Sequence, residues 1–240
     1  MKIIGLIGGM SWESSAEYYR ILNEETRKRL GELHSAELVM YSVDFEPIER
    51  LQHLGDWQAL SGMMIAAAQR VEAAGAQVLL LCTNTMHKFA DEIQANIHIP
   101  LLHIADATAL AISARQPGVK TVGLLGTRFT MEQDFYKDRL GAHGLDVVVP
   151  ELADRQIVHE IIYHELVLGI VREESKRSML QVIQRLVRAG AQGIILGCTE
   201  IPLLIHEGDA PVPVFDTTRI HAEKAVDIAL STDTRRSDLT

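Results

Sequence analysis

The sequence predicts an α/β protein made of two similar halves, each with a mainly parallel sheet covered by helices on both faces. Short runs rich in Leu and β-branched residues alternate with longer amphipathic stretches, which is typical of α/β folds. Several of these runs are almost wholly apolar, as expected for strands buried on both faces. Segments of the first half also return in the second half, in the same order.

Each apolar run is predicted to form a strand. In chain order, the predicted strands are 2–7, 36–42, 78–82, 101–104, 121–125, 146–149, 193–196 and 212–215. Helical periodicity begins near Ser14, where Tyr18, Ile21 and Leu22 share one face. It recurs over residues 56–74 and 174–189, and the polar end of the chain, 231–240, is expected to be frayed.

The internal repeat sets the predicted domain organisation. Residues 74–81 read AGAQVLLL, and AGAQGIIL follows about 115 residues later. The run IGLIG at 4–8 returns as VGLLG at 122–126, and IPL at 99–101 returns as VPV at 212–214. We therefore expect one lobe formed by 1–104 together with 217–240, and a second lobe formed by 105–216.

Composition excludes several classes of protein. Of the 240 residues, 47% are hydrophobic and 23% charged, which argues against disorder. The net charge of -9, without a basic patch, argues against binding to nucleic acid. No apolar run approaches the roughly 20 residues of a membrane span, and the apolar N-terminal stretch is too short for a secretory signal. With only two cysteines, we expect a cytoplasmic protein with free thiols.

Polar residues follow the apolar strand in both copies of the repeat. The shared register aligns Thr83 with Cys198, and Asn84 and Thr85 come directly after Thr83. Ligands of α/β sheets bind beyond the carboxyl ends of strands. We therefore expect Thr83 and Cys198 on opposite walls of a cleft between the lobes, where they can reach the two faces of one substrate carbon.

The two cysteines are assigned different roles. Cys198 precedes a turn whose backbone amides can favour the thiolate, although a buried structural cysteine is the alternative. Cys82 aligns with Gly197 and should point to the opposite face of its strand from Thr83, so we expect it to serve packing. The Thr83 hydroxyl is a poor base, but it can orient water or relay a proton; capping of the next turn is the alternative.

The first strand is followed by Gly8-Gly9-Met10-Ser11, which lacks the Lys of a phosphate loop and the spacing of a dinucleotide motif. We therefore expect no ATP or NAD, although backbone amides could bind a small anion here and in the matching loop at Thr127. The ten histidines have no zinc-ligand spacing, and no metal site is expected.

These motifs resemble those of the aspartate/glutamate racemase family: TNTMH at 83–87, GCTE at 197–200 and GGMS at 8–11. The resemblance covers nearly the whole chain. It implies two pseudo-symmetric three-layer lobes with an active-site cleft between them and no PLP or other cofactor. In this family one thiolate removes the α-proton of an amino acid, and a second thiol returns a proton to the opposite face. Thr83 stands where the family has its first Cys, so the chain is similar to a branch with one Thr and one Cys.

The resemblance also implies the site. Thr83 and Cys198 would be catalytic, with Cys198 the base for the L enantiomer. Related aspartate racemases hold a substrate-binding Lys near the position of Val167, and this chain has no Lys there. The implied partners are a small amino-acid substrate and a second copy of the chain, in a homodimer. The residues implied in substrate binding are Gly9, Met10, Ser11, Arg50, Asn84, Thr85, Thr127, Thr199 and Glu200.

Two other functions remain open from the sequence. A decarboxylase acting on arylmalonates needs a single proton donor, and release of carbon dioxide would reveal it. A two-lobed protein that has lost one of its bases could also bind amino acids without turnover. Solvent deuterium exchange at Cα would exclude this last function.

Overall fold

The computed structural model describes residues 1–231 and contains two compact units. Unit 1 comprises Met1–Ile104 and the chain from His221 onward, and unit 2 comprises Ala105–Ile220. Each unit has a parallel sheet flanked by helices, which confirms the predicted fold class. The second division between the units lies within helix α10 (Thr217–Leu230), four residues beyond the boundary expected at 216/217.

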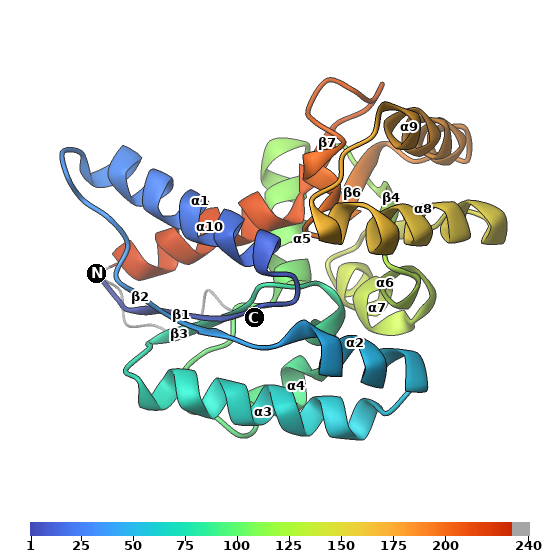
Figure 1. Ribbon diagram of the computed structural model, residues 1–240. Coiled ribbons are helices and arrows are strands. Elements are labelled where there is room, and N and C mark those ends of the chain that lie inside the picture. Colours follow the sequence, from blue (N-terminus) through green and yellow to red (C-terminus); the bar gives the residue numbers. More distant parts are fainter. Residues whose placement is uncertain (232–240) are drawn as a thin grey trace. The chain divides into compact units, whose positions relative to one another are not determined.

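The sheet of unit 1 has the order β2-β1-β3, and all its pairs are parallel. Figure 1 shows α1 and α10 on one face of this sheet and α3 and α4 on the other. The elements of this unit besides α10 are β1 (Ile4–Gly8), α1 (Trp12–Leu30), β2 (Leu38–Ser42), α2 (Phe45–Leu54), α3 (Trp57–Ala73), β3 (Val78–Leu81), the 3-10 helix η1 (Thr85–Phe89) and α4 (Ala90–Gln94).

The sheet of unit 2 has the order β5-β4-β6-β7, again parallel throughout. Apolar residues of α8 and α9 pack against β4 and β6, and they form the main core cluster of this unit. Its elements are α5 (Ile104–Arg115), β4 (Thr121–Gly126), α6 (Arg128–Glu132), α7 (Asp134–Ala142), β5 (Asp146–Val148), α8 (Leu152–His164), η2 (Leu166–Leu168), α9 (Glu173–Arg188), β6 (Gly193–Gly197), η3 (Ile201–Leu203) and β7 (Val214–Asp216).

The two glutamines of the repeat, Gln77 and Gln192, form hydrogen bonds to the backbone at the start of the neighbouring strand in each unit. In unit 1 the Gln77 N–H donates to the Ile3 carbonyl at 2.8 Å, and its side-chain oxygen accepts from the Ile3 N–H at 2.9 Å. In unit 2 the Gln192 N–H donates to the Thr121 carbonyl at 2.9 Å, and its side-chain oxygen accepts from the Lys120 N–H at 2.7 Å. The repeat found in the sequence is therefore also a repeat of hydrogen bonds.

The glycine of the same repeat ends a helix in both units. Gly75 follows α3 with φ 98°, and Gly190 follows α9 with φ 103°. This left-handed region of backbone space favours glycine, because other residues place a Cβ against the backbone there. The two turns lead into β3 and β6, so the strands that carry the candidate site start from equivalent positions.

One predicted strand is wrong. Residues 101–104 form a single bridge between Leu101 and Leu79, and α5 already begins at Ile104. The matching segment of unit 2 forms β7, yet the first hydrogen bond is the same in both units. The Leu79 N–H donates to the Pro100 carbonyl and the Ile194 N–H to the Pro213 carbonyl, each at 2.9 Å. The start of a helix cuts the strand short in unit 1.

The other predicted strands and the three predicted helices are present, with ends shifted by a few residues. The predicted fraying of 231–240 falls almost wholly outside the described residues. Among the described helices, none has the length and apolar character needed to cross a bilayer.

Candidate active site

In unit 1 the loop after β1 is closed tightly on itself. A Cβ on Gly9 (φ 93°) would lie 2.1 Å from the Val43 carbonyl oxygen, and a Cβ on Gly8 would lie 2.6 Å from the Ser15 hydroxyl. The Gly9 N–H donates to Ser15 Oγ at 2.7 Å, and Ser15 Oγ donates to the Ser11 carbonyl at 2.8 Å. The expected role of the Gly9 amide in holding a small anion therefore competes with this internal hydrogen bond.

The other two residues of this loop have structural contacts of their own. The Ser11 hydroxyl accepts the Ser14 N–H at 3.3 Å and so caps the N-terminus of α1. The Met10 side chain packs into the core of unit 1, which leaves its backbone as the part able to face a ligand. Both residues remain predictions as substrate contacts.

The strand end after β3 carries the Thr83 turn next to that loop. The Cys82 N–H donates to the Ile7 carbonyl at 2.9 Å, and the Ser14 hydroxyl donates to the Cys82 carbonyl at 3.2 Å. The residues that follow are buried polar ones, with Thr83 9%, Asn84 4% and Thr85 5% exposed. The structure thus brings together the two segments of unit 1 that the sequence singled out.

Cys82 itself is fully buried, and burial raises the pKa of its thiol far above the ordinary value. A thiol in such surroundings stays protonated and unreactive. This agrees with the packing role expected from the strand register.

Arg50 lies on α2, which begins at an Asp44 cap. Its side chain is 64% exposed, and its guanidinium lies 4.0 Å from the Glu46 carboxylate one turn earlier. The expected contact between Arg50 and a substrate carboxylate stays a prediction.

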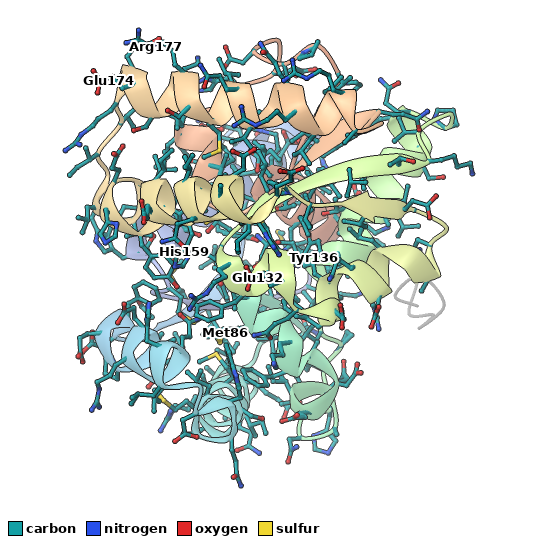
Figure 2. The ribbon with its side chains drawn as sticks, turned by 90° about the vertical axis from the view of Figure 1, so that its right-hand side faces the viewer. Met86, Glu132, Tyr136, His159, Glu174 and Arg177 are labelled. Atoms are coloured by element: carbon teal, nitrogen blue, oxygen red, sulfur yellow. The ribbon has the colours of Figure 1, made fainter. Side chains whose placement is uncertain are left out.

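In unit 2 the loop after β4 begins at Thr127. Its hydroxyl accepts the Thr130 N–H at 3.4 Å and caps α6. The Arg128 N–H lies 3.3 Å from Nδ1 of His159, which projects from α8 toward α6 (Figure 2). Sequence analysis assigned His159 no role, because His159 and His164 lack the companion acidic pattern of a metal site.

The strand end after β6 places Cys198, Thr199 and Glu200 together, and all three are buried. The Cys198 thiol and the Thr199 hydroxyl both donate to the same oxygen, Oε2 of Glu200, each at 2.9 Å. The three side chains therefore form one hydrogen-bonded group at the carboxyl end of the strand.

This environment raises the pKa of Cys198 well above its ordinary value. Burial is the largest cause, and the negative charge of Glu200 adds to it. The backbone amides of Thr199 and Glu200 act in the opposite direction, as the sequence suggested, but they are outweighed. The amides of this turn thus favour the thiolate as expected, but in the free protein they do not offset burial and the charge of Glu200.

Ser14, described above, and His87 of the TNTMH motif contact the backbone of the site directly, although neither was among the predicted catalytic or substrate-binding residues. Nδ1 of His87 lies 2.8 Å from the Thr83 carbonyl oxygen. The sequence left open whether His87 orients a neighbour or has only a structural role, and the structure shows that it contacts the Thr83 carbonyl. Within residues 1–231 no group of three His, Cys, Asp or Glu side chains is arranged to hold a metal ion.

Comparison with known proteins adds three similar chains. The solved structure of a candidate Asp/Glu racemase of Yersinia pestis is 55% identical, with a TM-score of 0.88 over 96% of this chain and 100% of that one. An aspartate racemase homologue of Pyrococcus horikoshii is 37% identical, with a TM-score of 0.83 over 96% and 100%. The broad specificity amino-acid racemase RacX of Bacillus subtilis is 22% identical over 95% of this chain and 99% of its own length.

The family described as Asp/Glu/hydantoin racemase matches residues 7–225, which include both strand ends and both loops of the candidate site. This match spans most of the chain and agrees with the resemblance drawn from the TNTMH and GCTE motifs. The chain therefore belongs to the Asp/Glu/hydantoin racemase family and is an isomerase of the amino-acid racemase class.

Proposed function

We propose that this protein interconverts the L and D forms of aspartate, glutamate or a closely related amino acid without a cofactor. The observation that carries the proposal is the chemical difference between two equivalent strand ends. A thiol stands at Cys198, and a hydroxyl stands at the matching position, Thr83. Racemisation needs a proton taken from one face of Cα and a proton given to the other.

In the proposed reaction Cys198 is the base for the L enantiomer. Its thiol first loses a proton to solvent, and the thiolate then takes the α-proton, so that the electron pair of the broken Cα–H bond remains on Cα. The Thr83 hydroxyl, or a water that it holds, gives a proton to the opposite face, and solvent replaces that proton. Cys198 ends the cycle as a thiol. The mechanism requires both groups to reach the same carbon.

The pKa of Cys198 explains why the substrate itself would take part in forming the thiolate. The Glu200 carboxylate raises this pKa in the free protein. A substrate ammonium group paired with Glu200 would offset that charge, and the pKa would fall when the substrate binds. Thiolate would then form mainly in the complex with an amino acid, while the free protein keeps an unreactive thiol.

The remaining predicted residues would orient the substrate. Asn84, Thr85, Thr127 and Thr199 offer hydroxyl and amide groups for the α-carboxylate and the amino group, and Arg50 offers a charge for the side-chain carboxylate. The backbone at Gly9, Met10 and Ser11 would line the same region. Except for Arg50, which lies in the middle of α2, these groups lie at or near the carboxyl ends of strands or at the start of the helices that follow.

An exchange assay in deuterium oxide tests the proposal. The L and D forms of aspartate and glutamate are each incubated with the protein, and deuterium at Cα and the enantiomer ratio are measured. Deuterium incorporation together with slow approach to equal amounts of the two forms supports the racemase. Binding without exchange would overturn it in favour of a binding protein. Activity that is lost on dialysis against a chelator and restored by one metal would overturn the cofactor-free mechanism.

A further inference from the structure

Three histidines gather beneath the Thr83 turn in unit 1. His87, His103 and His221 are 2%, 7% and 0% exposed. The ring centroids of His87 and His103 lie 4.7 Å apart, and those of His87 and His221 lie 5.6 Å apart. These side chains, called here the histidine cluster, come from three separate segments, η1, the stretch before α5, and α10.

The hydrogen bonds of His221 fix its tautomer. Nε2 lies 2.9 Å from the Leu102 carbonyl oxygen, which can only accept, so Nε2 carries a hydrogen. Nδ1 lies 2.8 Å from the Tyr18 hydroxyl. Burial, together with the nearby His87, lowers the pKa of His221 to about 3, so the ring is neutral and Nδ1 accepts the Tyr18 hydrogen. Both ring nitrogens of His221 therefore make hydrogen bonds, so this side chain is held in place and does not carry protons.

His87 uses its imidazole to hold the backbone of the catalytic turn. Nδ1 lies 2.8 Å from the Thr83 carbonyl oxygen, which fixes the hydrogen on Nδ1. The backbone N–H of His87 also donates to the Asn84 carbonyl at 3.1 Å. One residue further back, the Cys82 carbonyl accepts the Ser14 hydroxyl at 3.2 Å. Consecutive carbonyl groups at this strand end are thus each bound by a side chain.

We propose that His87 is a positioning residue. It fixes the Thr83 hydroxyl for proton transfer to the face of Cα opposite the one from which Cys198 takes the α-proton. This inference rests on the proposed racemase function. A ring packed against His103 and His221 has little freedom to turn, so its Nδ1–H holds the Thr83 carbonyl at a fixed place. Because Thr83 is a weak proton carrier, its contribution depends strongly on position, and an error of about 1 Å can cost on the order of 100-fold in rate.

The proposal predicts a split between two activities. Racemisation from L to D needs both Thr83 and Cys198. Exchange of the α-proton into recovered L substrate needs Cys198 alone, once its S–H proton has exchanged with solvent. Loss of the His87 contact should therefore reduce racemisation far more than exchange into L substrate. A merely structural role would reduce both by the same factor.

Two amide variants of His87 form a matched pair for the experiment. Asn places its N–H near the position of Nδ1, whereas Gln places its N–H near the position of Nε2. His87→Gln should lose racemisation by about 50-fold or more, while its L exchange falls less than about threefold; His87→Asn should recover racemisation to within about fivefold of the wild type. His143→Gln is the control, since His143 contacts Asp106 in unit 2 at 2.9 Å and no residue of the site.

Two further measurements keep the proposal testable if His87→Gln does not fold. Ser14→Ala removes the neighbouring contact, and it should reduce racemisation severalfold while L exchange is retained. The ¹⁵N spectrum of the wild-type histidines should show His87 protonated at Nδ1 and His221 protonated at Nε2.

Several results would overturn the proposal. They are wild-type racemisation in His87→Gln, equal losses of both activities in that variant, no recovery in His87→Asn, no loss of racemisation in Ser14→Ala, or His87 protonated at Nε2. A wild-type protein that neither racemises nor exchanges would overturn the proposed function, and the role of His87 with it. In that case the ¹⁵N spectrum still shows separately whether the hydrogen bond to Thr83 exists.

Discussion

The two strand ends that carry the candidate site share hydrogen bonds, turns and strand register but differ in the side chains that surround them. In unit 1 the Thr83 turn lies over the histidine cluster, in which burial lowers the pKa of His221 to about 3. In unit 2 the Cys198 thiol donates to the Glu200 carboxylate, whose charge raises the pKa of the thiol. The difference lies in a few side chains. The hydrogen bonds of Gln77 and Gln192, the turns at Gly75 and Gly190, and the strand register are shared.

Under the proposed function, one scaffold would provide two kinds of proton-transfer group. A thiol can be converted to a base by a modest change of nearby charge, because its ordinary pKa is close to neutral. A hydroxyl cannot, and it must be effective through its position. In the proposed reaction, unit 2 would therefore control the charge around Cys198, and unit 1 would control the position of Thr83.

The largest effect is expected from removing the thiol. Cys198→Ala should reduce α-proton exchange from L substrate by about 1,000-fold or more, since Cys198 is the proposed base for the L enantiomer. The measurement is deuterium incorporation into L-aspartate and L-glutamate. Cys82→Ala is the matched control, and it should change stability by about 1 kcal/mol while exchange is retained. A folded Cys82→Ala protein without activity would contradict the strand-register assignment.

Making unit 1 resemble the family pattern should produce the next largest effect. Thr83→Cys supplies a second thiol and should raise exchange from the D substrate by about 50-fold, with little change for the L substrate. The wild type should exchange the α-proton of the L form much faster than that of the D form, although the final ratio of enantiomers stays even. Equal rates for the two forms in the wild type would refute the assignment of Thr83 to the weaker side.

The histidine cluster should make unit 1 sensitive to acid. The pKa of His221 is about 3 in the folded protein and about 6.5 when unfolded, so the unfolded chain binds more protons between these values. Stability that is fully present above pH 6.5 should fall by about 2 kcal/mol on going to pH 5. Denaturant titrations followed by Trp12 and Trp57 fluorescence report on unit 1, since both tryptophans lie there.

The matching variant is His221→Gln, which removes the titrating group. It should be less stable at neutral pH, because the Tyr18 contact is lost, but its stability should change less between pH 7 and pH 5. An identical pH dependence in both proteins would show that His221 is not the source of the acid sensitivity.

The smallest effect concerns the charge beside the thiol. Glu200→Gln removes the carboxylate that helps to raise the pKa of Cys198, so the thiolate should form at lower pH. Alkylation of Cys198 by iodoacetamide in the absence of substrate should become severalfold faster at a given pH below that pKa. Turnover should fall in the same variant, because the substrate ammonium loses its partner. Unchanged alkylation would show that burial alone controls this thiol.

Much of the fold followed from local patterns. The apolar runs located most strands, since parallel strands buried on both faces leave little room for polar residues. The segment 101–104 is the exception, because its apolar character did not distinguish a buried strand from a short bridge followed by the start of α5. A run of four residues is too short to show whether its apolar positions follow the helical or the strand period.

The sequence by itself determined the family, the two repeated units and the positions of Thr83 and Cys198, because motif and register are properties of neighbours along the chain. Only the tertiary structure decided how these groups are held. His87 contacts Thr83, and His221 closes the cluster from a helix more than a hundred residues away in the chain. The pKa of Cys198 likewise depends on burial, which no local pattern measures. Hydrogen-bond geometry and desolvation arise from packing between distant segments, and therefore appear only once the chain has folded.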